Sequence, residues 1–142
     1  MLTEFSHKLF VGSMDDARKF KGIVVNVLEI NDSIRNDGVK FEMGKDEIYF
    51  PIFNDLIAKF DIVQLELLFR FVVRKRMLGD VPILIHCGVG IERSPFAMAY
   101  VLFRMGDYPT LNSAYTAVVK VRRVGRNVWD WVPSWWGRLG LP

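Results

Sequence analysis

Cys87, Arg93 and Ser94 carry side chains whose types and spacing could together perform chemistry. They fall in the segment 86–94, which has the sequence HCGVGIERS. A cysteine thiolate is a strong nucleophile, and an arginine guanidinium can hold two phosphate oxygens in its planar fork. The serine hydroxyl could donate a hydrogen bond to the sulfur when that sulfur acts as a leaving group. Together these groups suit the transfer of a phosphoryl group to and from Cys87.

The residues around this segment favour a strand before it and a helix after it. The apolar run Val81–Ile85 predicts a buried strand that ends just before the cysteine. Ser94 is a good N-cap and Pro95 suits the first helical position, so we expect a helix that includes Phe96–Met105. A loop between a strand and a helix N-terminus binds anions, because its N–H groups converge and the helix dipole favours negative charge. We therefore expect Cys87 to be a thiolate at neutral pH.

The residues between the cysteine and the arginine are the candidate substrate-binding loop. Their backbone N–H groups would hold the equatorial phosphoryl oxygens together with Arg93. Gly90 would let the backbone turn tightly, because it has no Cβ. We interpret the side chain of Glu92 as pointing outward from the anion, and that of His86 as orienting the loop rather than acting as a base. The loop residues are Gly88, Val89, Gly90, Ile91 and Glu92.

The pattern His86-Cys87-x-x-Gly90-x-x-Arg93-Ser94 resembles the HCxxGxxR(S/T) signature of the cysteine-based protein tyrosine phosphatases. The short chain is similar to their dual-specificity branch. This resemblance implies an α/β fold with a central mixed, mostly parallel sheet of about four to five strands flanked by helices. It would cover residues 1–142 as a single domain. It also implies catalysis without a cofactor or metal ion, on a phosphorylated protein or peptide.

Phosphoryl transfer from a thiolate also needs a general acid to protonate the leaving oxygen. In dual-specificity phosphatases the acid is an aspartate that follows an apolar strand, at a similar distance before the cysteine. Asp55 matches that position, because it follows the apolar run 48–53 and lies 32 residues before Cys87. Two alternatives remain open. Asp55 could instead cap the helical turn 56–60, or Asp61 could be the acid rather than the N-cap of the next helix.

The composition is that of a globular protein with a real core. The chain has 142 residues, of which 51% are hydrophobic, and a formal net charge of +3. A single cysteine excludes an internal disulfide and a CxxC metal site. The first residues lack an apolar signal core, and the longest apolar run, Pro95–Phe103, is too short to span a bilayer. We therefore expect a soluble, cytoplasmic protein.

The rest of the chain predicts strands alternating with helices. Ser13 is expected to cap the first of these helices. The predicted strands are Lys8–Val11, Ile23–Leu28 and the pair Val39–Met43 and Ile48–Ile52, and the predicted helices are Met14–Phe20, Ile62–Leu78 and Leu111–Val121.

Three further groups of residues have alternative interpretations. The basic cluster Arg70, Arg74, Lys75 and Arg76 is most simply a solvated helix face, with substrate or nucleic-acid binding as the alternative. Arg122, Arg123 and Arg126 are most simply solvated, although one of them could form a second anion site. The four tryptophans of Val128–Pro142 are expected to cap the core in a final helix, and the alternative is a partner or membrane patch. The family resemblance implies that Asn127 braces the cysteine loop.

The favoured function is a metal-independent phosphatase acting on phosphotyrosine, and on phosphoserine and phosphothreonine. The alternatives are an RNA 5′-triphosphatase, which the basic charge permits, and a pseudophosphatase that binds phosphate without hydrolysis. The rhodanese-like group is disfavoured by the segment that carries Asp55. Nucleic acid is a less favoured partner than a phosphoprotein, and the sequence does not indicate an oligomeric state.

Overall fold

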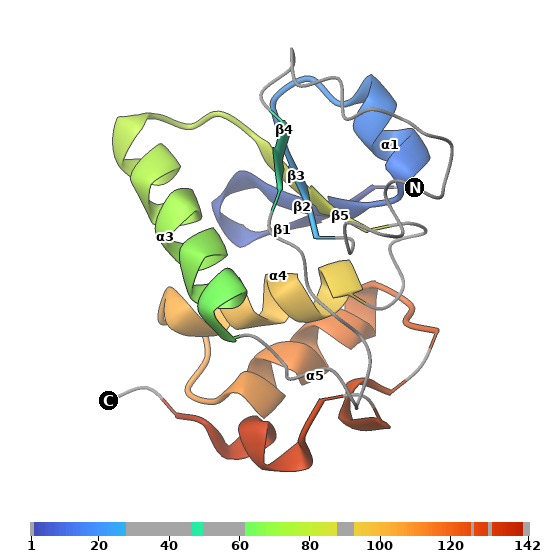
Figure 1. Ribbon diagram of the computed structural model, residues 1–142, viewed down its shortest axis with the longest axis vertical. Helices are drawn as coiled ribbons and strands as arrows, with labels where there is room; N and C mark the ends of the chain where they lie inside the picture. The colour runs from blue at the N-terminus through green and yellow to red at the C-terminus, as the bar shows by residue number, and fades with distance from the viewer. Residues whose placement is uncertain are drawn as a thin grey trace.

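The computed structural model describes residues 2–27, 47–49, 62–87, 93–125, 127–130 and 132–140, with only the backbone for 47–49. A five-stranded sheet forms its centre, with the order β1-β2-β5-β3-β4 (Figure 1). β1 pairs with β2 in antiparallel orientation, and the other three pairings are parallel. The strands are β1 Thr3–Phe5, β2 Leu9–Gly12, β3 Ile23–Asn26, β4 Glu47–Tyr49 and β5 Ile83–His86. The predicted fold class, a mixed and mostly parallel sheet flanked by helices, is confirmed.

Strand β5 lies at the middle of the sheet, between β2 and β3. Ile83 is opposite Leu9 on one side and Ile23 on the other, and the pairing continues in register to His86. β3 and β5 are buried at every position, and β2 at every position but one. Strands covered on both faces have continuous apolar sequences, which is why 23–25 and 83–85 were recognisable in the sequence.

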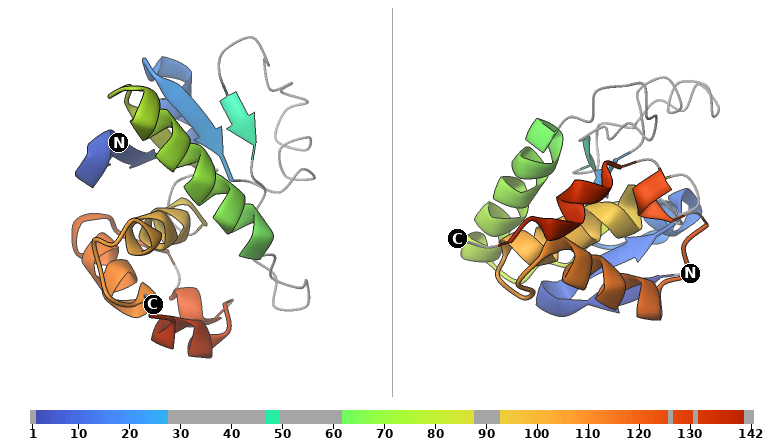
Figure 2. Two further views of the ribbon diagram at one scale, coloured as in Figure 1. Left: turned by 90° about the vertical axis from the view of Figure 1, so that its left-hand side faces the viewer. Right: turned by 90° about the horizontal axis from the view of Figure 1, so that it is seen from below.

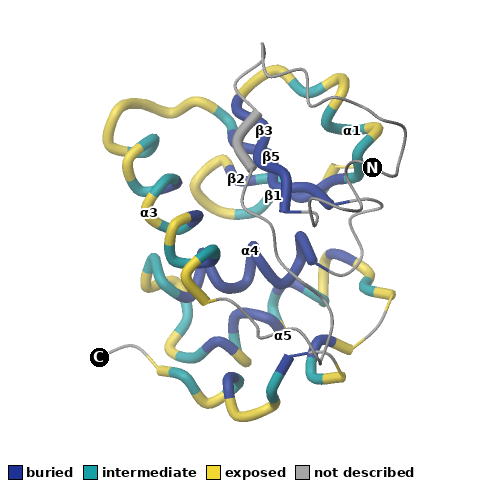
Figure 3. Tube along the Cα trace, in the orientation of Figure 1, coloured by how far each residue is buried: buried dark blue, intermediate teal, exposed yellow. Residues whose placement is uncertain are grey.

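Helix α4 (Arg93–Arg104) is the central helix of the fold. Every residue from Arg93 to Phe103 is buried, and the helix packs on β2 and β5 with α3 and α5 against it (Figure 3). Helix α1 lies apart from this group and contacts β2 and β5 (Figure 1). The other helices are α1 Met14–Lys19, α3 Ile62–Leu78 and α5 Leu111–Val121, with 3₁₀ turns η1 Ser6–Lys8, η2 Val128–Asp130 and η3 Ser134–Arg138.

The predicted helices α3 and α5 have the bounds that the sequence indicated, and β2, β3 and β5 differ from the prediction by one or two residues at an end. β4 overlaps the predicted strand Ile48–Ile52 at Ile48 and Tyr49, and it pairs with β3 in parallel. The segment Val39–Met43 lies outside the described residues. Strand β1 was not predicted, because Thr3–Phe5 is too short to show a strand periodicity.

Two local features flank helix α1, and the first of them, the Ser13 cap, was predicted. Ser13 is the N-cap, and its hydroxyl accepts a hydrogen bond from the backbone N–H of Asp16 at 3.2 Å. The Asp16 carboxylate accepts in return from the backbone N–H of Ser13 at 2.8 Å, which completes a capping box. After the helix, Gly22 has a φ of +153°, and a Cβ there would lie 2.5 Å from the carbonyl oxygen of Pro82. Only glycine fits this close approach to the chain that leads into β5.

The C-terminal segment covers α5 as two 3₁₀ turns rather than as the predicted final helix (Figure 2). Trp136 is buried in the core, and the ring of Trp129 meets that of Tyr115 edge-on at 6.0 Å. These two tryptophans cap the core as predicted. Trp135 is exposed instead, and Trp131 lies outside the described residues.

A polar cluster joins α3 to α4. Arg104 Nε donates to Glu66 Oε1 at 2.7 Å, and the hydroxyl of Tyr100 donates to the same oxygen. Burial would raise the pKa of Glu66, but the hydrogen bonds from Arg104 and Tyr100 outweigh it and hold that pKa below its ordinary value. Burial, and then the Glu66 carboxylate, raise the pKa of the Tyr100 hydroxyl. Glu66 is therefore ionised and tied to two residues of the neighbouring helix.

We expect Glu66→Gln to destabilise the fold by about 1–2 kcal/mol, because it removes a charge-assisted pair and leaves Arg104 without its carboxylate. The control is Asp15→Asn, which breaks the exposed Asp15–Arg18 pair and should cost less than about 0.5 kcal/mol. Urea unfolding followed by circular dichroism measures both changes.

The pH dependence of the Glu66 effect has a definite sign. A carboxyl group whose pKa is lower in the folded state stabilises the fold above its unfolded pKa and loses that effect as pH falls through its folded pKa. The stability difference between wild type and Glu66→Gln should therefore shrink as the medium is acidified below the ordinary glutamate range. A difference that stays constant over that range would contradict the ionised pair.

Candidate active site

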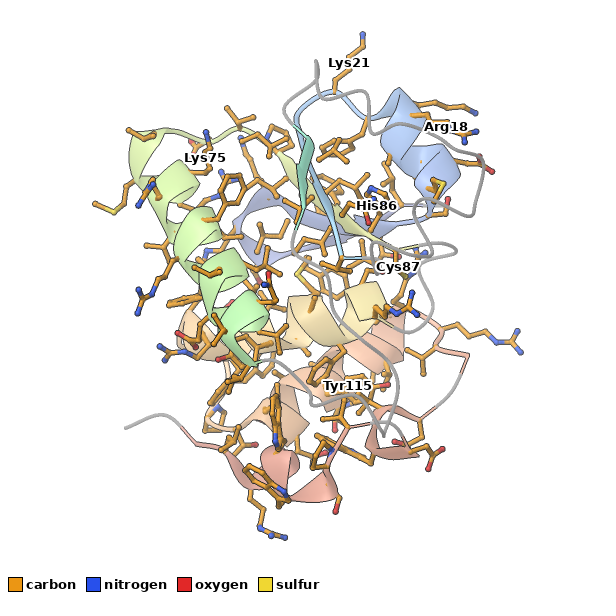
Figure 4. All side chains as sticks on the ribbon, viewed as in Figure 1. Arg18, Lys21, Lys75, His86, Cys87 and Tyr115 are labelled. Atoms are coloured by element: carbon orange, nitrogen blue, oxygen red, sulfur yellow. The ribbon has the colours of Figure 1, made fainter. Side chains whose placement is uncertain are left out.

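The ends of three neighbouring strands lie beside Cys87, the candidate nucleophile. Gly12, His86 and Asn26, the last residues of β2, β5 and β3, lie side by side in the register of the sheet. Cys87 follows His86 directly (Figure 4). The carboxyl ends of parallel strands are the usual place for a site in an open α/β sheet, because loops from adjacent strands converge there.

The sulfur of Cys87 lies beside the first turn of α4. Cys87 Sγ is 3.3 Å from the hydroxyl oxygen of Ser94, and Cys87 itself is only 4% exposed. Ser94 is fully buried, and its hydroxyl is a polar neighbour of the sulfur. This geometry places a hydrogen-bond donor where a departing thiolate would need one.

The predicted N-cap role of Ser94 is wrong. Helix α4 begins at Arg93, so Ser94 and Pro95 are its second and third residues. Pro95 is still compatible with the helix, because the first-turn N–H groups have no partner within a helix. The hydroxyl of Ser94 points to the sulfur, which explains why a residue typical of an N-cap lies inside the first turn.

His86 lies where it can fix the start of the loop. Its Nδ1 is 3.0 Å from the carbonyl oxygen of Cys87, and its backbone carbonyl accepts a hydrogen bond from the N–H of Val27 at 2.9 Å. The residue is buried, so this side chain holds the backbone of the next residue from within the fold. This is the position expected of a residue that orients the loop.

Arg93 is the first residue of α4 and is 9% exposed. A buried guanidinium at the helix N-terminus, in the same turn as the hydroxyl that contacts the sulfur, suits the anion-binding role predicted for it. The loop Gly88–Glu92, the candidate acid Asp55 and its rival Asp61 lie outside the described residues. Their roles stay predictions.

The side chain of Asn127 forms a hydrogen bond with the backbone of η2. It is exposed, and its Oδ1 accepts a hydrogen bond from the backbone N–H of Trp129 at 2.9 Å, so it caps η2. It also lines an open hollow of about 240 Å³ with Tyr115, Val119, Val124 and Gly125. The bracing of the loop implied by the family resemblance stays a prediction.

Two buried polar residues near this edge were missed or misread in the sequence. Asn26 is fully buried at the end of β3, and the signal for it was a polar residue that closes an apolar run. Arg122 was interpreted as solvated but is only 9% exposed, which is a correction. Its guanidinium donates to the Thr3 hydroxyl at 3.1 Å and to the Val11 carbonyl at 3.4 Å. The unpredicted strand β1 supplies one of these acceptors, so the sequence could not show why this arginine is buried.

Within the part of the chain that the structure describes, no three histidine, cysteine, aspartate or glutamate side chains gather as metal ligands would. In the same residues, no helix combines the length and apolar character that crossing a membrane requires.

No family model matches this chain, and no curated protein matches its sequence. Solved structures do match it. Human DUSP28 aligns with a TM-score of 0.65 and 22% identity, over 91% of this chain and 88% of that one. The PTP-2 phosphatase of Cydia pomonella aligns with a TM-score of 0.66 and 21% identity, over 89% and 83%. The chain has the dual-specificity phosphatase fold.

A third solved structure shows that the dual-specificity phosphatase fold extends to proteins described in other terms. The human tyrosine phosphatase-like serine/threonine/tyrosine-interacting protein aligns with a TM-score of 0.66 and 19% identity, over 89% of this chain and 87% of that one. The structural alignments establish the fold, but with identities near 20% they do not establish the activity. The activity of this chain therefore has to be argued from its own residues.

Proposed function

We propose that this protein is a metal-independent phosphatase that hydrolyses phosphotyrosine, and phosphoserine and phosphothreonine, through a cysteinyl-phosphate intermediate. The observation that carries the proposal is the 3.3 Å contact between Cys87 Sγ and Ser94 Oγ at the carboxyl end of β5. The dual-specificity phosphatase fold around this contact supports the same chemistry. A cytoplasmic location is part of the same proposal.

In the first step the Cys87 thiolate attacks the phosphorus atom of the substrate. An S–P bond forms as the ester P–O bond breaks, and the leaving oxygen takes a proton from the carboxyl group of Asp55. Arg93 and the N–H groups of Gly88–Glu92 hold the equatorial oxygens throughout, in line with the electrostatic character of phosphoryl transfer.

In the second step a water molecule attacks the cysteinyl phosphate. Asp55, now a carboxylate, accepts a proton from the water as the new P–O bond forms and the S–P bond breaks. The electron pair of the S–P bond returns to Cys87 as a thiolate, and the Ser94 hydroxyl donates a hydrogen bond to it. Inorganic phosphate leaves and the site is restored.

A test of the proposed activity is the hydrolysis of p-nitrophenyl phosphate in the presence of a chelator. We expect turnover that survives chelation and extends to peptides carrying phosphotyrosine, phosphoserine or phosphothreonine. Release of phosphate from triphosphorylated RNA, with no release from the peptides, would contradict the proposed substrate class.

A second candidate function is phosphopeptide binding without hydrolysis. One solved structure with the same fold is described as tyrosine phosphatase-like and as an interacting protein, which favours keeping this candidate. In that case the wild-type protein would bind a phosphotyrosine peptide in isothermal titration calorimetry, whereas the same peptide would remain intact after prolonged incubation. Calorimetry and a hydrolysis assay with the same phosphotyrosine peptide therefore distinguish the two functions.

Replacing Ser94 with alanine should slow the second step more than the first. A hydrogen bond to a charged group contributes about 1.5–3 kcal/mol, which corresponds to a loss of about 10- to 100-fold in the rate of thiolate departure. Rapid-quench kinetics should show a burst of p-nitrophenol that equals the enzyme concentration, followed by slow turnover. The conservative variant Ser94→Thr, which keeps the hydroxyl, is the matched control. Equal kinetics for the alanine variant and wild type would show that Ser94 does not assist the departure of the thiolate.

A further inference from the structure

Helix α3 carries apolar side chains on the side that faces away from the core. The residues Val63, Leu67, Arg70, Arg74 and Met77, here called the outer stripe, recur at intervals of four and three residues and so lie on one side of the helix. Val63 is 56% exposed, Leu67 43% and Met77 81%. Figure 2 (left) shows α3 crossing the front of the molecule with this length of helix toward the viewer. Fourteen residues separate the two ends of the stripe, a length of about 21 Å.

The spacing of the outer stripe is that of a seam between two helices. Alternating steps of four and three residues keep a stripe facing a partner helix over several turns. The side chains that hold α3 on the protein, Leu65, Leu68 and Val72, are buried on the opposite side. Among the residues that the structure describes, packing therefore involves one side of α3, and Val63, Leu67 and Met77 stay exposed on the other.

Arg70 and Arg74 are the charged residues of the outer stripe. The other two members of the basic cluster are engaged, because Arg76 donates to the carbonyls of Gly79 and Val81 and Lys75 lies 5.6 Å from the centre of the Phe71 ring. Both stripe arginines are exposed, and neither forms an ion pair with another residue that the structure describes.

The acidic group of α3 compensates these two arginines only in part, because Glu66 attracts Arg70 but forms its hydrogen bonds with α4. Glu66 is the helix's one carboxylate, and Arg104 and Tyr100 on α4 hold it. The outer stripe is therefore apolar at both ends and positive at its centre. Burying that centre against another surface requires negative charge on the partner, since an unpaired arginine is costly to desolvate.

The charge pattern also selects among possible occupants. In an antiparallel pair formed by a second copy of α3, the central arginines would meet their own counterparts, and facing like charges disfavour such a dimer. A membrane is also disfavoured, because the arginines protrude from the middle of the stripe rather than flanking an apolar face that could insert.

We propose that the outer stripe of α3 docks an amphipathic helix of a partner protein, with apolar residues at its two ends and acidic residues between them. The acidic side chains pair with Arg70 and Arg74, while the ends pack on Val63, Leu67 and Met77. The proposal concerns a surface that includes no catalytic residue, so it stands whether or not the site hydrolyses phosphate.

The test uses two fluorescein-labelled 21-residue helical peptides that differ at two central seam positions, with leucine at the outer seam positions of both. One peptide has glutamate at the centre and the other has lysine. Fluorescence anisotropy at low salt should show saturable binding of the glutamate peptide, weakened by about tenfold or more in R70E/R74E and by added salt. The lysine peptide should bind R70E/R74E better than it binds wild type.

The matched control is K19E/K21E, which changes the net charge equally on exposed lysines outside α3 and should leave glutamate-peptide binding unchanged. Equal binding of both peptides to wild type, or binding of neither, would overturn the proposal. It would also be overturned if sedimentation velocity showed a dimer that R70E/R74E dissolves, or if vesicles of phosphatidylcholine and phosphatidylserine bound wild type and not R70E/R74E.

Discussion

Replacing Cys87 with serine is expected to lower kcat for p-nitrophenyl phosphate by about 10⁴-fold or more. The serine hydroxyl lies at the same point but is not deprotonated at neutral pH, so the first P–O bond is not broken by attack from this residue. Steady-state absorbance of released p-nitrophenol measures the loss, and a chelator in every assay excludes hydrolysis by contaminating metal.

The Cys87→Ser variant should still bind substrate. The anion-binding groups proposed for the loop and for Arg93 are unchanged, so a phosphotyrosine peptide should bind in calorimetry with an affinity similar to that of wild type. The unfolding midpoint in urea should also stay near the wild-type value, since serine is smaller than cysteine and has a hydroxyl beside it at Ser94. Retention of more than about a tenth of wild-type kcat would show that another group is the nucleophile.

Replacing Asp55 with alanine should lower kcat by about 10²–10⁴-fold. The loss should be larger for phenyl phosphate than for p-nitrophenyl phosphate, because the more basic leaving oxygen depends more on receiving a proton. The fall of kcat at higher pH, which arises as the acid loses its proton, should disappear in the variant. Both effects are read from pH–rate profiles with the two substrates.

Asp61→Ala is the matched control for the acid assignment. It removes a carboxyl group six positions further along the chain, and the pH–rate profile of this variant should be the same as that of wild type. If Asp61→Ala loses the high-pH limb while Asp55→Ala keeps it, the acid is Asp61, and the assignment made from the distance to Cys87 is wrong.

The motif and the long elements of this fold were predictable because their signals are local. The segment 83–87 gives an apolar strand followed by a cysteine, and its place at the centre of the sheet follows from burial on both faces. Helices α3 and α5 have the predicted bounds, because glycine ends α3 and Thr110 caps α5 with a reciprocal hydrogen bond to Ser113.

The unpredicted features depend on side-chain contacts that residue types alone do not show. Ser94 has the residue type of an N-cap, yet it lies inside α4 because its hydroxyl contacts a sulfur seven residues earlier in the chain. Arg122 is buried because Thr3 and Val11 accept its hydrogen bonds from more than a hundred positions away. Local propensity cannot report such partners, and those of Arg122 become its neighbours only after the sheet has formed.

The central place of β5 has a consequence for how the protein is made. Leu9–Gly12 and Ile23–Asn26 leave the ribosome early, but the strand that joins them, Ile83–His86, follows after nearly sixty further residues. Until it arrives, β2 and β3 each have one edge without the strand that pairs with it, and such unpaired edges favour aggregation. We expect nascent chains halted before residue 83 to depend on chaperones. The cysteine then gains its surroundings in the same event that closes the sheet.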